Sequence, residues 1–263
     1  MKGDLGTGRK AREEILKVYL DAYEKYHFEG NRRGMAQTLE KIGDISASMD
    51  KLRDAYDFYM RSLEIWREIG DEKAMAEVLR KLGVVSHKMN RLHEAQTYLK
   101  DAHALYEQLG DNQGIAVVLH EMGIVSSKMR NYRRAEEFFS KSLEIDRRLN
   151  NELGMAETLH ELGNIYAVQE KYAEAQKHYF ESLQLKIKLK DKVGEAITRA
   201  ALGQIYLLRG NPEEAMEMWR ASLPVLEANG LPDAEVVRDW IRSSTSRMER
   251  ERLRKLKFME MRK

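Results

Sequence analysis

A period of 40 residues is the feature of this sequence that most limits what it can fold into. Glycine recurs at this spacing five times without slippage, and alanine does so at two further positions of each unit. The positions are Gly43, Gly83, Gly123, Gly163 and Gly203; Ala36, Ala76, Ala116, Ala156 and Ala196; and Ala55, Ala95, Ala135, Ala175 and Ala215. A strict period of this length indicates a repeat array in which one supersecondary unit is stacked many times. We therefore expect one continuous solenoid in which each unit contacts mainly its neighbours.

Each repeat unit has the pattern of two helices, which we call helix A and helix B. In residues 154–190, apolar side chains follow helical intervals before and after a short polar turn at Lys171. Polar joints such as Gly110-Asp111 separate the units, since Gly or Asn favours the left-handed residue after a helix and Asp or Asn caps the next helix. Lys190 departs from the first half of this rule. The sequence predicts an all-α solenoid of stacked antiparallel helix pairs.

The glycines inside helix A require a packing reason. Each costs roughly 1 kcal/mol relative to alanine in a helix. We expect helices A and B to cross at these glycines, with the alanine series of helix B that begins at Ala55 as the opposite small surface.

The spacing resembles the tetratricopeptide repeat. That motif has a Leu-Gly pair and an aromatic residue in helix A, then alanine, an aromatic and a small residue in helix B. Two units carry it as Leu162, Gly163, Tyr166, Ala175, Tyr179 and Ser182, and as Leu202, Gly203, Tyr206, Ala215, Trp219 and Ser222. The first three units depart at the helix A aromatic, with Ser46, Ser86 and Ser126. The 40-residue period is similar to that of kinesin light chains, spindle-orientation adaptors and certain bacterial regulator domains. The resemblance implies a right-handed superhelix whose concave face is lined mostly by helix A.

The ends of the array look like partial units. The expected segments are a flexible N-terminus at 1–10, a partial repeat helix at 11–33, five units at 34–230, and C-terminal capping helices with a basic tail at 231–263. The first partial unit is in the register of helix B and the last in that of helix A. Leu253, Leu256 and Met259 are spaced as an apolar stripe that would cap the last unit. A partner-binding helix and a charged flexible tail are the alternatives for this tail.

Composition narrows the function classes. The net charge of +2 gives no argument for a nucleic-acid partner, and the absence of cysteine excludes disulfides, thiolate metal sites and a cysteine nucleophile. The sequence has no apolar run long enough to span a bilayer, no apolar core of a secretion signal at its start, and no phosphate-binding loop. His120 and His160 lie in adjacent units, about 10 Å apart, which is too far to share a zinc ion at ~2 Å. We expect a cytoplasmic protein that is not an enzyme and has no metal or cofactor.

The helix A residues opposite the core predict a binding groove that is apolar along its floor and basic at its edges. Its members are Arg80, Val84, Lys88, Val117, His120, Ile124, Lys128, His160, Asn164 and Gln204. We expect Val84 and Ile124 to be exposed, and the groove to suit a partner with apolar anchors and acidic neighbours. An ordinary surface with single exposed apolar residues is the alternative interpretation.

Two groove residues carry more specific expectations. In relatives, an asparagine after the Leu-Gly pair often holds the backbone of an extended peptide, so the resemblance implies this role for Asn164. The equivalent positions of the early units lack asparagine, which argues against the clamp by which some relatives hold chaperone C-termini. His120 and His160 would strengthen binding of an acidic partner as the pH falls through ~6.5, the ordinary histidine pKa.

These features predict an adaptor or scaffold that binds a peptide or helix of a partner protein in the concave groove. One alternative is a regulatory sensor whose superhelix changes when a peptide binds. Another is a self-assembling scaffold whose apolar ends stack between copies. A nucleic-acid role would rest only on the basic tail and scattered lysines, and we expect none. The sequence does not encode the identity of the partner.

Overall fold

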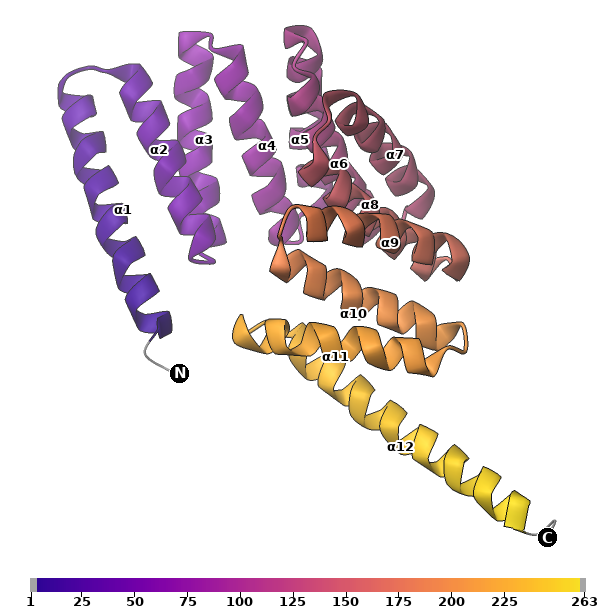
Figure 1. Ribbon diagram of the computed structural model, residues 1–263. Helices are drawn as coiled ribbons and strands as arrows, with labels where there is room; N and C mark the ends of the chain where they lie inside the picture. The colour runs from indigo at the N-terminus through magenta and orange to yellow at the C-terminus, as the bar shows by residue number, and fades with distance from the viewer. Residues whose placement is uncertain (1–3, 261–263) are drawn as a thin grey trace. The chain divides into compact units, whose positions relative to one another are not determined.

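The chain is all-helical. The computed structural model describes the backbone of residues 4–260 and the side chains of residues 12–246, and within that range it has twelve helices and no strand (Figure 1). The helices are α1 (Asp4–Phe28), α2 (Arg32–Ser48), α3 (Leu52–Ile69), α4 (Glu72–Lys88), α5 (Leu92–Leu109), α6 (Asn112–Lys128), α7 (Tyr132–Leu149), α8 (Glu152–Val168), α9 (Tyr172–Lys188), α10 (Lys192–Leu208), α11 (Pro212–Ala228) and α12 (Asp233–Glu260). Because α1 begins at Asp4, helical structure reaches into the segment 1–10 that we expected to be flexible.

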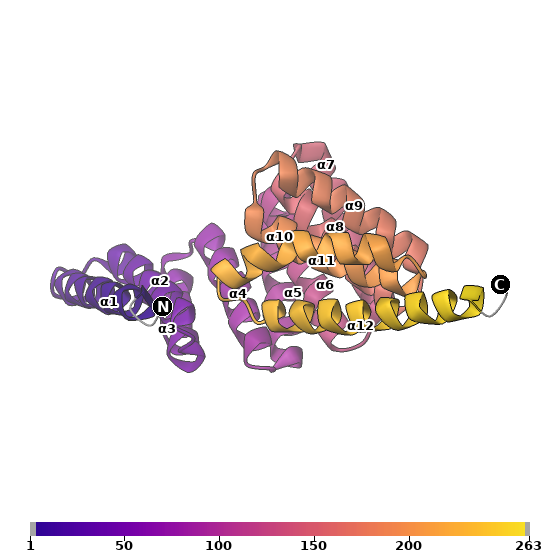
Figure 2. The same ribbon diagram turned by 60° about the horizontal axis from the view of Figure 1, so that its bottom comes forward.

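The helices group into two compact units. Unit 1 is Met1–Ile145 and unit 2 is Asp146–Lys263, so the boundary lies inside α7 rather than at a joint between repeats. In unit 1, α2 pairs with α3 and α4 with α5, and α4 packs against α6. In unit 2, α8 pairs with α9 and α10 with α11, and α12 follows beside α11 (Figure 2). The predicted A–B helix pairs are confirmed in both units, whereas the single continuous body that we expected is divided in two.

The mid-helix glycines lie where helices A and B cross, as predicted. A Cβ atom added at Gly43 would come within 2.5 Å of Tyr59, and one at Gly123 within 2.6 Å of Phe139. The main opposing group is therefore the large side chain four residues after the helix B alanine. Ala55, the expected opposing surface, is itself fully buried. The glycine leaves space for this large side chain as well as for a small one.

The joints between units are capped as the sequence predicts. Each helix A begins with an Asp or Asn whose side chain accepts a hydrogen bond of 2.9–3.2 Å from the backbone N–H three residues later. The caps are Asn31, Asp71, Asp111, Asn151 and Asp191. Lys190 adopts the left-handed conformation of this joint, with φ of 59°, although it is neither Gly nor Asn. The turn inside each unit has a left-handed residue as well, such as Arg130 with φ of 59°.

A single helix, α12, covers the C-terminal end of the array where we expected several capping helices. Its Val237 is fully buried, and its Trp240 packs against Trp219 of α11 with ring centroids 5.5 Å apart. The capping contacts that the described side chains make thus come from the first half of α12. The stripe that we expected to do this lies outside the described side chains: Leu253, Leu256 and Met259.

Candidate functional site

The predicted groove residues of unit 1 lie on two helices A that pack against each other, α4 and α6. On each helix the earlier residues are half-buried and the last, a lysine, is exposed. We call this set the basic–apolar stripe: Arg80, Val84 and Lys88 on α4, with Val117, His120, Ile124 and Lys128 on α6. None of them is fully buried, but Val84 and Ile124 are less accessible than we expected. The structure therefore brings these residues onto two adjacent helices without placing any of them in the core.

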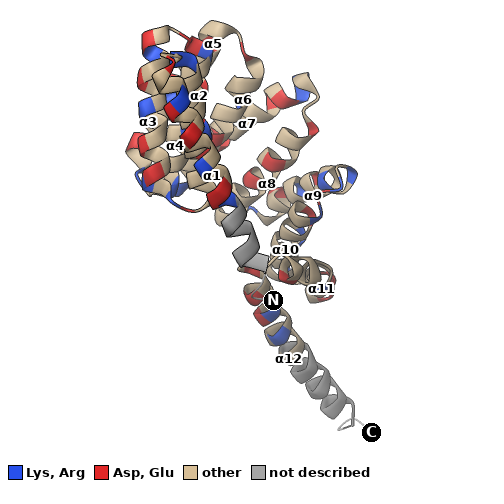
Figure 3. Ribbon diagram, turned by 90° about the vertical axis from the view of Figure 1, so that its left-hand side faces the viewer, with Lys and Arg blue, Asp and Glu red and all other residues tan. Residues whose placement is uncertain are grey.

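The C-terminal ends of α4 and α6 form the basic end of the stripe. Burial lowers the pKa of His87, and the charges of Lys128 and Lys88 lower it further. Both lysines therefore disfavour the charged form of the same histidine. Lysines in the last turn also interact favourably with the helix dipole. Elsewhere on unit 1, acidic and basic residues are interspersed (Figure 3).

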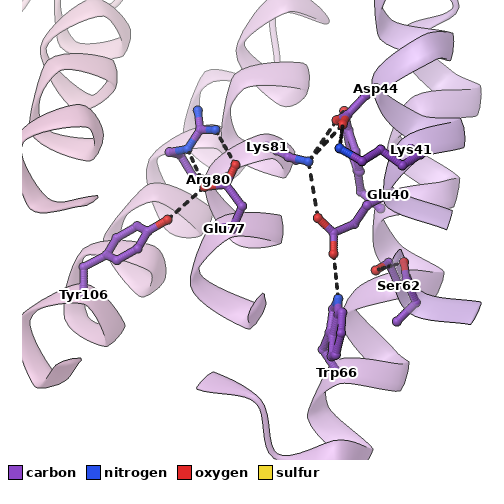
Figure 4. A network of polar contacts seen from close by, with 11 residues as sticks. Glu40, Lys41, Asp44, Ser62, Trp66, Glu77, Arg80, Lys81 and Tyr106 are labelled. Carbon is purple, nitrogen blue, oxygen red and sulfur yellow. Dashed lines mark hydrogen bonds and ion pairs between the residues drawn. The ribbon is translucent and has the colours of Figure 1, made fainter. Parts of the chain in front are cut away.

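Arg80 belongs to an ion pair on its own helix. Its Nε and Nη2 donate to the two carboxylate oxygens of Glu77 at 3.1 and 2.6 Å, and the Tyr106 hydroxyl donates to the same carboxylate at 3.0 Å (Figure 4). Burial alone would raise the pKa of Glu77, but the hydrogen bonds and charge of Arg80 outweigh it and hold this pKa below its usual value. The charge of the half-buried Arg80 is therefore neutralised by Glu77, whereas the sequence led us to expect a free cation.

A cavity of about 430 Å³ opens beside this ion pair. Its lining comes from α4, α5 and the start of α6: Lys73, Glu77, Arg80, Tyr106, Asp111, Gln113, Gly114 and Val117. The predicted groove includes Arg80 and Val117 of this set. Glycine also recurs at Gly34, Gly114, Gly154 and Gly194, with Ala74 in the remaining position. This series could have revealed the place of Tyr106, because a Cβ at Gly114 would overlap it.

Neighbouring helices A of unit 1 are joined by a lysine between two carboxylates. The ammonium of Lys81 on α4 lies 3.3 Å from Glu40 and 3.0 Å from Asp44 of α2 (Figure 4). Two helix B residues donate to the same carboxylates, Tyr59 to Asp44 at 2.8 Å and Trp66 to Glu40 at 2.7 Å. Burial raises the pKa of Glu40, while the charge of Lys81 opposes the rise. These acidic groups connect two successive repeats of unit 1.

In unit 2, Asn164 is engaged by its own helix pair. Its Oδ1 accepts a 2.6 Å hydrogen bond from the Tyr179 hydroxyl, and its Nδ2 donates to Glu161 at 3.1 Å. The oxygen that would receive a peptide N–H thus has a partner within the fold. Gln204 on α10 is exposed.

The two groove histidines are held neutral. His160 Nδ1 lies 3.1 Å from the hydroxyl of Thr198, which accepts from the buried Lys186 at 2.9 Å, so the threonine is left to donate to the imidazole. Burial, and then Lys186, lower the pKa of His160 to about 3. Burial lowers the pKa of His120, which packs edge-on against Phe139, to about 4. The expectation that these histidines titrate near pH 6.5 is wrong.

Two further findings concern other classes of site. Within residues 12–246, no group of three or more His, Asp or Glu side chains is arranged to hold a metal ion. None of the helices in the described part of the chain combines the length and apolar character that crossing a membrane requires.

Comparisons with known proteins agree with this architecture. A family model described as tetratricopeptide repeat matches residues 34–108, 74–148 and 154–228. No curated protein matches the chain in sequence.

Several solved structures share the fold at low sequence identity. BtubC (BKLC) from P. vanneervenii has a TM-score of 0.72 at 19% identity, with 84% of this chain and 93% of that chain covered. The apo form of the quorum sensor NprR from B. thuringiensis has a TM-score of 0.66 at 16% identity, with 86% of this chain and 61% of that chain covered. A putative kinesin light chain from Podosopora anserina, with nearly identical repeats of this type, has a TM-score of 0.60 at 13% identity, with 74% and 95% covered.

Proposed function

Because the chain belongs to the tetratricopeptide repeat family, we propose that it is a non-catalytic interaction module whose basic–apolar stripe binds a segment of a partner protein. One observation supports this most. Val84 and Ile124 occupy equivalent positions on two adjacent helices, and each is followed one turn later by an exposed lysine. An apolar pair beside a basic pair on neighbouring helices suits a ligand that spans both.

The stripe favours a partner segment with apolar anchors and acidic neighbours. Val84 and Ile124 retain accessible apolar surface that a ligand can remove from water. Lys88 and Lys128, the exposed last residues of α4 and α6, supply positive charge at one end. Because the stripe histidine stays neutral, the lysines set the charge of the site, and binding should change little between pH 6 and 8.

Replacing both Val84 and Ile124 by Asp should weaken binding at least about tenfold, since anchors near the centre of an interface carry most of its energy. The ligands would be peptides selected from a random display library on the full-length protein. We expect them to combine apolar and acidic residues. Fluorescence anisotropy with the selected peptides measures the change in affinity.

Two control variants make this test decisive. Val84 and Ile124 are half-buried, so each Asp should also cost about 1 kcal/mol of stability. The milder pair Val84→Thr and Ile124→Thr should weaken binding with less effect on the thermal melt. Phe180→Asp changes an exposed apolar residue on α9 of unit 2 and should leave affinity unchanged. Undiminished binding by the folded Asp or Thr variants would refute the assignment of the stripe.

A regulatory sensor is the second candidate. The division of the chain into two compact units favours it, because a ligand that binds unit 1 could change how unit 2 is presented. One protein of the same fold is described as a quorum sensor. Small-angle scattering with and without a selected peptide separates the candidates, since only a sensor requires a change of the scattering curve. The absence of cysteine suits a reducing compartment, and we propose a cytoplasmic location.

A further inference from the structure

Helix α1 is in the register of a helix B, and in the described part of the chain it packs against α2, the helix A that follows it. This contact corresponds to that of α3 with α4. The 40-residue register places its Tyr19 at the position of Tyr59 and its Tyr26 at that of Trp66. Gly34 confirms this register in three dimensions, because a Cβ there would come within 2.7 Å of Tyr26.

The complete pair α2–α3 shows what a helix A contributes at this position. It offers two carboxylates one turn apart, Glu40 and Asp44, on a face that contacts helix B. Tyr59 and Trp66 of helix B donate hydrogen bonds to them, and Lys81 of the next helix A lies between them. Only 16% of the Lys81 side chain is exposed.

Similar receiving groups recur at α1 and α2, but no pair of carboxylates from the described residues meets them there. Lys41, which is equivalent to Lys81, has 58% of its side chain exposed and reaches only Asp44 of its own helix, at 3.9 Å (Figure 4). The hydroxyls of Tyr19 and Tyr26 have no hydrogen-bond partner among the described residues. Ile15, at the position of a fully buried alanine in the complete units, is 47% exposed.

A cavity of about 370 Å³ lies between these groups. Helices α1 and α2 line it with Tyr19, Ala22, Tyr26, Gln37, Thr38, Glu40 and Lys41. We call this surface the α1–α2 seat. It combines the rings of Tyr19 and Tyr26 with two tyrosine donors, one accessible cation and Glu40, whose carboxylate is already engaged by Trp66 and Lys81. Aromatic donors and a lysine are also what hold α2 in its place on α3 and α4.

We propose that the α1–α2 seat binds an amphipathic helix of a partner protein, distinct from the segment bound by the basic–apolar stripe. The partner helix carries two carboxylates one turn apart with a small residue between them, as Glu40, Gly43 and Asp44 do within the chain. Its carboxylates accept from Tyr19 and Tyr26 and pair with Lys41, while its small residue allows a close approach to α1. Docking of an amphipathic helix into an apolar groove is an established mode of recognition.

The chain itself supplies a probe for this seat. A peptide of residues 31–49 carries Glu40, Gly43 and Asp44, and a lactam bridge on its solvent face would keep it helical, since isolated short helices are marginal in water. The fluorescent peptide should bind the full-length protein saturably. In the protein, Lys41→Glu should weaken this binding at least about tenfold, since a like charge facing the carboxylates replaces an attraction. Lys100→Glu, at an exposed lysine of α5, is the matched control and should bind as the wild type does.

Charge reversal of the peptide completes the test. A peptide with Glu40→Lys and Asp44→Lys should bind the Lys41→Glu protein better than it binds the wild type. The pair Val84→Asp and Ile124→Asp should bind the original peptide normally, so failure of the stripe and failure of the seat are distinguishable. Absence of saturable binding, or equal binding by the Lys41→Glu protein, would overturn the proposal. A concentration-dependent mass in light scattering that Lys41→Glu abolishes would overturn it too, because the seat would then belong to a second copy of the chain.

Discussion

At the scale of single residues, the approach of helix A to helix B depends on a glycine facing a large side chain. Tyr59, Leu99, Phe139, Tyr179 and Trp219 occupy this position in successive units, and each would collide with a Cβ on the glycine opposite. The side chain opposite each glycine is well buried in every unit. The glycine thus allows a large apolar side chain to reach the helix backbone, and burial of that side chain outweighs the cost of glycine in a helix.

Even a single methyl group at Gly123 should destabilise unit 1. On an open helix Gly→Ala gains roughly 1 kcal/mol, but here the new Cβ meets the Phe139 ring at 2.6 Å. Overpacking of this kind costs typically about 1–3 kcal/mol, so Gly123→Ala should lower the free energy of unfolding measured in urea. In a Phe139→Ala background the same change should be neutral or stabilising. A destabilisation of equal size in both backgrounds would mean that the ring is not the obstacle.

At this scale, the sequence predicted correctly those features that recur with the 40-residue period. It located the crossing glycines and the helix caps, because both recur every 40 residues. It missed that Asn164 is engaged, since the hydrogen bond from Tyr179 spans helices and depends on the reach of a ring. The pair Tyr59 and Asp44 has the same 15-residue spacing, so a comparison between units would have revealed the contact.

At the scale of helices, successive repeats are joined by different side-chain hydrogen bonds, although the backbone of the joints repeats. The same position of the repeat is occupied by Trp66 in one repeat and by the buried Lys186 in another. Trp66 donates to Glu40, whereas Lys186 donates to Thr198 beside His160. The sequence predicted the joints by their caps but not these side-chain networks, because each forms between residues that are unrelated in the repeat pattern.

Because the fold holds His160 neutral, we predict that the protein loses stability in mild acid. The folded-state pKa of His160 lies far below 6.5, at about 3, so the unfolded chain binds the proton first. The stabilisation is complete above the ordinary histidine pKa and is lost as the pH falls toward the folded value. His120 adds to the same trend. Between pH 7.5 and 5, His160 should account for a fall of about 1–2 kcal/mol in the free energy of unfolding.

Urea titrations at the two pH values test this prediction, with His160→Gln as the comparison. The variant lacks the titrating group, so its stability should fall less than that of the wild type over this interval. The charge that acts on His160 is that of Lys186 on α9. Lys186 in turn is influenced by Glu157 and Glu161 on α8 and by Asp191, the cap of α10. An identical loss in both proteins would mean that His160 is not held neutral by the fold.

At the scale of the whole molecule, one repeat pattern yields surfaces of different chemistry. The basic–apolar stripe of unit 1 arises because the helix A surface positions are free to vary while the core positions are not. The α1–α2 seat arises because α1 packs against α2 in the register of a helix B. The sequence predicted the stripe residues but not the division into two units, because the period continues unbroken through α7 at the boundary.

Methyl NMR of the full-length protein tests the central claim, that the basic–apolar stripe is the binding surface, most directly. A peptide selected for apolar and acidic residues would be titrated into protein labelled at its isoleucine and valine methyl groups. The account predicts saturable shifts of the Val84 and Ile124 methyls, with Val237 of α12 unchanged. Shifts confined to Ile15 and Val18 on α1, or to methyls of unit 2, would contradict it.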